Sequence, residues 1–314
     1  AALMSTLSGP MAEWGVREIT IKVLGMKLVE AEREGRVVLL YHSFFMPVVA
    51  ILVYFITANV SIKENWGIFI NSTVTVGYIT AVFSGIGFAY FGHSPALHGL
   101  MLVGLSLVFF AGVMLAVALW PWNKEYYLSS DSPYAHTRGG VDLERVAFWV
   151  VTVATLGSAA LGAWAGAYYG SGFETVLAED IVRQPIKTTL ELAVIGHLHI
   201  MLSLIGITAI LLLGRWFDFH GFCHRLAMPL LIIGSITMTI GCWGVVSFQS
   251  IAHIIIYTGS LFALAGALFL VIFQWKIKNA TAGQKIKALL YDPLKFGALW
   301  QIIFMNFTTT FVGI

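Results

Sequence analysis

Residues 188–214 read TTLELAVIGHLHIMLSLIGITAILLLG, a stretch that is apolar all round and carries two histidines, His197 and His199. A bilayer span needs about 20 mostly apolar residues. Because apolar and polar residues do not alternate here, the stretch predicts a transmembrane α-helix rather than a strand of a membrane barrel. Glu191 is the carboxylate that we place well within this span.

Composition extends this interpretation to the whole chain. Of the 314 residues, 58% are hydrophobic, 14% aromatic and only 11% charged, and the mean hydropathy is +0.84. Soluble domains are roughly 45–50% apolar and about 25% charged. A soluble globule with so little charge could not cover its surface. Soluble enzymes, nucleic-acid-binding proteins and disordered chains are therefore excluded, and we interpret the chain as an integral membrane protein.

The same length rule predicts about eight spans along the chain. They cover residues 39–57, 66–91, 96–120, 146–170, 188–214, 226–246, 251–275 and 296–314. Small residues within them, such as Gly99 and Gly196, allow flat macrocycles or neighbouring helices to approach closely. The predicted fold class is all-α, a polytopic transmembrane helix bundle that occupies residues 38–314 and is embedded in the lipid bilayer.

Residues 1–37 have a different pattern. Apolar residues such as Ile19 and Val23 alternate with charged ones such as Arg17 and Lys22 at near-helical spacing. Such a segment is typical of an amphipathic helix that lies at the membrane interface. A helix that binds a partner protein is the alternative.

The distribution of positive charge predicts the orientation. More Lys and Arg residues, among them Arg145 and Arg215, fall on the side opposite the N-terminus. Cytoplasmic connections carry this excess, so we expect the N-terminus outside. The expected location is the inner (plasma) membrane of a prokaryote.

Six histidines fall in one half of the predicted membrane. They are His42, His93, His98, His197, His199 and His253. Ionisable residues inside a membrane have a functional role by default, because an unpartnered one is costly. His42 and His253 lie near the interface. For these two, a structural role and a functional role are equally good interpretations. His93 lies in a turn, where a structural role is favoured.

Neutral histidines in an apolar bundle suit haem iron or a copper or zinc centre. His197 and His199 point about 200° apart on a helix with 3.6 residues per turn. They therefore favour two groups on opposite faces, such as two haems, over one chelated ion. Arg183 and Lys187 precede this span, where they can pair with haem propionates or simply anchor the helix at the interface.

Two motifs resemble the haem–copper oxidase and nitric oxide reductase superfamily. Residues 196–203, GHLHIMLS, are similar to its His-x-His helix, in which the first histidine holds the high-spin haem and the second holds the low-spin haem. Residues 97–101, LHGLM, resemble the helix that supplies the opposite low-spin ligand. The resemblance implies that His98 and His199 hold a low-spin haem b, and that His197 is the axial ligand of a second haem.

The copper-site motifs of that family are absent from this sequence. Between His98 and His197 the only histidine is His136, in a polar connection. The resemblance therefore implies a b-type haem subunit that transfers electrons without a copper centre, alongside other subunits of a respiratory complex. Cytochrome c or quinol is the implied redox partner.

Two other functions stay open. A copper-dependent membrane oxidoreductase would use His93 and His98, and a non-catalytic anchor or transporter would use its histidines for packing or proton transfer. His220 and His224, spaced i and i+4 beside Cys223, suit a zinc site less well than a solvated connection. Cys223 in this connection and Cys242 inside a span are badly placed for a disulfide.

Overall fold

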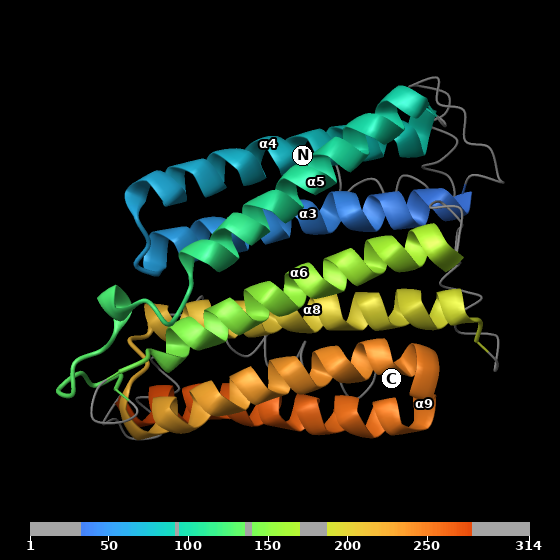
Figure 1. Ribbon diagram of the computed structural model, residues 1–314. Coiled ribbons are helices and arrows are strands. Elements are labelled where there is room, and N and C mark those ends of the chain that lie inside the picture. Colours follow the sequence, from blue (N-terminus) through green and yellow to red (C-terminus); the bar gives the residue numbers. More distant parts are fainter. Residues whose placement is uncertain (1–32, 92–93, 136–139, 170–186, 278–314) are drawn as a thin grey trace, which may run out of the picture. The chain divides into compact units, whose positions relative to one another are not determined.

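The structure, a computed structural model, describes residues 33–91, 94–135, 140–169 and 187–277 (Figure 1). Within these ranges six helices are long and apolar enough to cross a membrane. They are α3 (Arg33–Asn59), α4 (Glu64–Phe91), α5 (Pro95–Ala118), α6 (Leu143–Tyr169), α8 (Thr189–Trp216) and α9 (Gly221–Ile277). The only strand-like pairing in the described part is one β-bridge between Leu128 and Gly140.

The longest helix, α9, contains two of the predicted spans. Its 57 residues would measure roughly 85 Å as one rod at 1.5 Å per residue, far more than a bilayer core of about 30 Å. The backbone leaves helical geometry at Phe248, with φ −140° and ψ 57°, and the helix folds back there (Figure 1). The prediction of spans at 226–246 and 251–275 is therefore confirmed as two antiparallel arms.

Small residues let the two arms of α9 approach closely. A Cβ placed on Gly234 would lie 2.9 Å from the backbone nitrogen of Ala263, and one on Gly259 would lie 2.7 Å from that of Met238. Transmembrane helices associate through van der Waals packing of this kind, since lipid provides no hydrophobic force between them.

The chain forms two compact units. The first contains Ala1–Ala58, Ile62–Leu115 and Ala160–Val194, and the second contains Asn59–Ser61, Ala116–Ala159 and Ile195–Ile314. In the first unit α4 packs on α5, with Gly104 directly against the backbone of Ala81. The Tyr54 hydroxyl of α3 also shares a 2.6 Å hydrogen bond with Thr75 of α4.

The all-helical class is confirmed for the described residues, and six helices there are long and apolar enough to cross a membrane. The helices match seven of the predicted spans, although several helices extend beyond their apolar windows. The predicted span at 296–314 lies outside the described residues, as does most of the predicted amphipathic segment. Helix α3 begins at Arg33, so it already runs through the predicted boundary between residues 37 and 38.

Candidate functional site

The structure distributes the predicted histidines over four helices. His42 lies on α3, His98 in the first turn of α5, His197 and His199 on α8, and His253 on the second arm of α9. All five side chains are half-buried. His42 and His98 belong to the first unit, and the other three belong to the second. His93 and Arg183 lie outside the described residues, and Lys187 comes just before α8.

His197 is held by a polar contact between three helices of the second unit. Its Nδ1 lies 3.1 Å from the carbonyl oxygen of Ser158 on α6. The Ser158 hydroxyl accepts a hydrogen bond of 3.3 Å from the indole Nε1 of Trp243 on α9, and the rings of His197 and Trp243 are 6.2 Å apart. Because Ser158 is fully buried, these bonds fix the imidazole plane of His197.

His199 is held by its own helix. Its Nδ1 lies 2.8 Å from the carbonyl oxygen of Ile195, one turn earlier. A carbonyl oxygen only accepts hydrogen bonds, so Nδ1 of both histidines carries the hydrogen in these contacts, and in a neutral ring the lone pair is then on Nε2. This neutral tautomer is the form in which histidine binds metals.

Close backbone packing fixes the position of the histidine-bearing turn. Gly196 lies directly against the carbonyl of Cys242 on α9, in a place that no side chain can share. On α5, by contrast, a Cβ placed on Gly99 would meet no atom within 4 Å. The sequence predicted that a flat macrocycle or a neighbouring helix approaches closely at both glycines; a neighbouring helix does so at Gly196, whereas Gly99 has open space beside it.

The expectation that Glu191 lies well within a span is wrong. Glu191 lies in the first turn of α8, where its Oε2 accepts a 2.6 Å hydrogen bond from the backbone N–H of Thr188. In return the Thr188 hydroxyl accepts a 3.2 Å bond from the backbone N–H of Glu191. This reciprocal pair is a capping box, which satisfies two backbone donors at a helix start. The apolar window includes these cap residues, so hydropathy alone misplaced the carboxylate.

A second polar region, missed from the sequence, lies where α6 begins and α8 ends. Arg145 is 2% exposed and donates to the carbonyls of Ser61 at 2.7 Å and Ala118 at 2.6 Å. Its guanidinium also lies 3.6 Å from the ring centre of Tyr126. Cations favour the C-terminal ends of helices, where carbonyls lack partners, and Ala118 is the last residue of α5.

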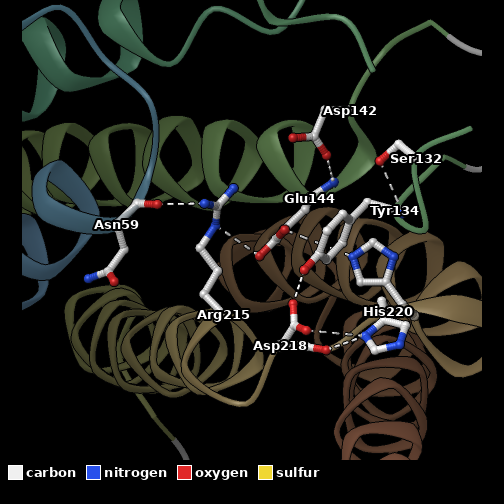
Figure 2. Close-up of polar contacts among 9 residues, drawn as sticks. Asn59, Ser132, Tyr134, Asp142, Glu144, Arg215, Asp218 and His220 are labelled. Carbon is white, nitrogen blue, oxygen red and sulfur yellow. Dashed lines mark hydrogen bonds and ion pairs between the residues drawn. The ribbon is translucent and has the colours of Figure 1, made fainter. Parts of the chain in front are cut away.

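Beside it, a group of titratable side chains surrounds a buried carboxylate (Figure 2). We call this group the loop-end cluster; it comprises Tyr134, Glu144, Arg215, Asp218, His220 and His224. The Nε of Arg215 lies 3.1 Å from Oε1 of Glu144, and Nε2 of His224 lies 3.9 Å from Oε2 of Glu144. Arg215 also donates a 2.5 Å hydrogen bond to the carbonyl of Asn59.

The outer part of the loop-end cluster reaches water. The Tyr134 hydroxyl donates to Asp218, and Nδ1 of His220 lies 2.5 Å from the backbone carbonyl of Asp218. Burial, reinforced by the hydrogen bond to Asp218, raises the pKa of Tyr134 to about 12. Tyr134 therefore stays a neutral donor at physiological pH.

The prediction of a solvated connection at His220 and His224 is wrong for His224. The side chain of His220 is 39% exposed, but His224 is fully buried in the first turn of α9. Cys223 is buried in the same turn rather than lying in a polar connection, and both it and Cys242 are free thiols, as predicted. The i and i+4 spacing of the two histidines carried no signal of burial.

No group of three or more His, Cys, Asp or Glu side chains fit to hold a metal ion occurs within the described ranges. The zinc alternative at His220 and His224 is therefore not supported there. A haem site would not meet this criterion of three side chains, because axial ligation of haem iron needs only one or two. Comparisons with protein-family models, with curated proteins and with solved structures each found no match.

Proposed function

We propose that this chain is an integral membrane b-type haem subunit that transfers electrons within a respiratory complex. The observation that carries the proposal is the pair of histidines on α8, each with Nδ1 bonded to a backbone carbonyl. Two such side chains in the interior of an apolar helix suit metal ligation better than packing alone.

The tautomer supports the fit to haem. Hydrogen bonding of Nδ1 to a carbonyl orients a ligating imidazole and makes Nε2 more basic. His197 depends on α6 for this bond and His199 on α8 itself. The two rings therefore have separate supports, as two separate haem groups would require.

The remaining ligands are proposals from the sequence. His98 is the proposed second ligand of the low-spin haem with His199, and His42, His93 or His253 is the proposed second ligand beside His197. Arg183 and Lys187 are the proposed propionate partners. Bound haem supplies an iron that changes by one electron, with a potential set by its axial ligands and its surroundings.

The chain's own residues orient the ligands and exclude water. Ile200 and Leu204, which follow the histidines on α8, are fully buried, so they keep the surroundings of the ligands apolar. A low local dielectric strengthens every hydrogen bond that holds the imidazoles. Electrons enter or leave through cytochrome c or quinol in this proposal, and the other subunits of the complex complete the route.

Two alternatives remain. The copper-dependent oxidoreductase would need His93, outside the described residues, together with His98. A non-catalytic anchor or a transporter would need neither haem iron nor copper. An inverted repeat or a broken helix would favour a transporter, and the break in α9 at Phe248 turns one helix into another rather than interrupting a span.

Substitutions on α8 test the ligand assignment. In detergent-purified protein, His199→Ala should remove the low-spin b-type absorbance, and His197→Ala should remove a different spectral component. Leu198→Met, between the two histidines, is the control, because this swap conserves volume and changes no ring nitrogen. A low-spin spectrum that survives His199→Ala would contradict the assignment.

A further inference from the structure

The loop-end cluster contains an imidazole and a carboxylate that the proposed electron transfer does not use. His224 and Glu144 are both almost completely buried, and their nearest charged atoms are 3.9 Å apart. Buried ionisable groups are rare unless they are paired or functional. Glu144 already has Arg215 as an ion-pair partner at 3.1 Å, so His224 is not needed to neutralise it.

The charges around His224 come from three parts of the second unit. Helix α6 contributes Glu144 and Arg145. Asp142, just before this helix, has a carboxylate that accepts a 3.0 Å hydrogen bond from the backbone N–H of Glu144. Helix α8 contributes Arg215. The connection before α6 contributes Tyr134, whose ring centre is 5.7 Å from that of His224.

These charges oppose one another. The Glu144 carboxylate favours a protonated His224, whereas Arg215, which pairs with the same carboxylate, disfavours it, as does burial. A neutral imidazole has one lone pair that can bind a proton. Attraction and repulsion are therefore present together at His224, as a site that takes up and releases a proton requires.

Tyr134, Asp218 and His220 are linked to one another by polar contacts (Figure 2). The side chain of Asp218 is 73% exposed and that of His220 is 39% exposed, and they lie 3.8 Å apart. Asp218 accepts the hydrogen bond from Tyr134, whose ring contacts His224 edge-on. Tyr134 therefore lies against both the exposed pair and the buried imidazole.

We infer that Glu144 and His224 form a proton-binding site that exchanges protons with water through Tyr134, Asp218 and His220. The proton comes from a hydronium ion or a buffer acid, which is left as water or as its conjugate base. It binds the lone pair of the His224 ring, which becomes an imidazolium facing the Glu144 carboxylate. No electron moves, so this site and the proposed haem sites can succeed or fail separately.

Infrared difference spectroscopy after a pH step tests the inference on the full chain in lipid nanodiscs. Isotope labelling of histidine identifies the imidazole bands. The wild-type chain should show a histidine band and a carboxylate band that change together between pH 8 and 5, where histidine titrates. His224→Gln should remove the histidine component, and Glu144→Gln, which retains a hydrogen-bond acceptor for Arg215, should remove the carboxylate component.

The proposed proton path is tested by the rate at which the infrared histidine signal changes, rather than by the amplitude of that signal. Tyr134→Phe and Asp218→Asn should slow the histidine signal severalfold while leaving its size unchanged. Asp131→Asn removes an exposed carboxylate from the same connection and should alter neither. Unchanged amplitudes in both Glu144→Gln and His224→Gln would overturn the site, and unchanged rates in both path variants would overturn the path. If the two site variants fail to fold, a wild-type spectrum without a titrating buried histidine overturns the site as well.

Discussion

Histidines in two regions of the second unit have different partners. On α8, His197 and His199 contact backbone carbonyls, which accept a hydrogen bond and carry no full charge. In the loop-end cluster, His224 faces the Glu144 carboxylate. A carbonyl partner fixes one neutral tautomer, whereas a carboxylate partner also stabilises the charged form. The first arrangement suits a metal ligand, and the second suits a proton acceptor.

The largest expected effect is at the loop end, for Arg145→Ala. The backbone carbonyls of Ser61 and Ala118 would lose a charged donor. Hydrogen bonds to charged groups contribute about 1.5–3 kcal/mol each, so we expect a loss of about 3 kcal/mol or more in unfolding free energy. Thermal melting in detergent measures it. Lys124→Ala, at an exposed position, should change stability by less than about 0.5 kcal/mol, and equal losses in both variants would contradict the account.

The next effect concerns the histidine-bearing turn of α8. Gly196→Ala would push a methyl group into the Cys242 carbonyl, and overpacking of this kind costs about 1–3 kcal/mol. Gly99→Ala on α5, where no atom lies within 4 Å, is the matched control and should be neutral or slightly stabilising. A Gly196→Ala variant as stable as Gly99→Ala would show that α8 and α9 do not pack closely at this turn.

A smaller effect distinguishes the role of the Ser158 hydroxyl from that of the Ser158 backbone carbonyl. Ser158→Ala removes the hydroxyl that accepts from Trp243 but keeps the carbonyl that accepts from His197. One neutral hydrogen bond contributes about 1 kcal/mol, so stability should fall by that amount while the visible spectrum stays unchanged. A spectrum altered as strongly as in His197→Ala would mean that the hydroxyl, not the carbonyl, orients the imidazole.

The smallest effect appears in alkali, at the exposed side of the loop-end cluster. The pKa of Tyr134 is raised to about 12 from its ordinary 10.0, so folding favours the neutral phenol. This stabilisation is complete below pH 10 and is lost as the pH rises towards 12. The wild-type chain should therefore lose stability relative to Tyr134→Phe over that window. A stability difference between the wild-type chain and Tyr134→Phe that stays constant from pH 9 to 12 would contradict the raised pKa of Tyr134.

Hydropathy predicted the helices because a chain in lipid must satisfy every backbone polar group within its own helix. It predicted the second polar region poorly, because a helix does not end where its apolar window ends. The fourth predicted span begins at residue 146, yet α6 begins at Leu143, and the added turn contains Glu144 and Arg145. Likewise α8 ends at Trp216, beyond the window that stops at residue 214, and the added turn contains Arg215.

The partners and the burial of the site histidines depend on tertiary contacts. The His-x-His spacing predicted that two imidazoles leave α8 in different directions, since that follows from helix geometry. Their partners, the Ser158 carbonyl and the Ile195 carbonyl, are backbone atoms that no side-chain pattern identifies. The burial of His224 depends on Tyr134 and Phe219, whose rings pack edge-on against it. Neither residue belongs to an apolar window.

Whether α8 holds haem iron can be read from the porphyrin and metal content of the unmodified protein. We expect noncovalent haem b at about two per chain, in keeping with two oppositely directed ligands on one helix. Copper without porphyrin would favour the copper-dependent alternative. A colourless protein with neither metal would contradict the account and leave the anchor or transporter.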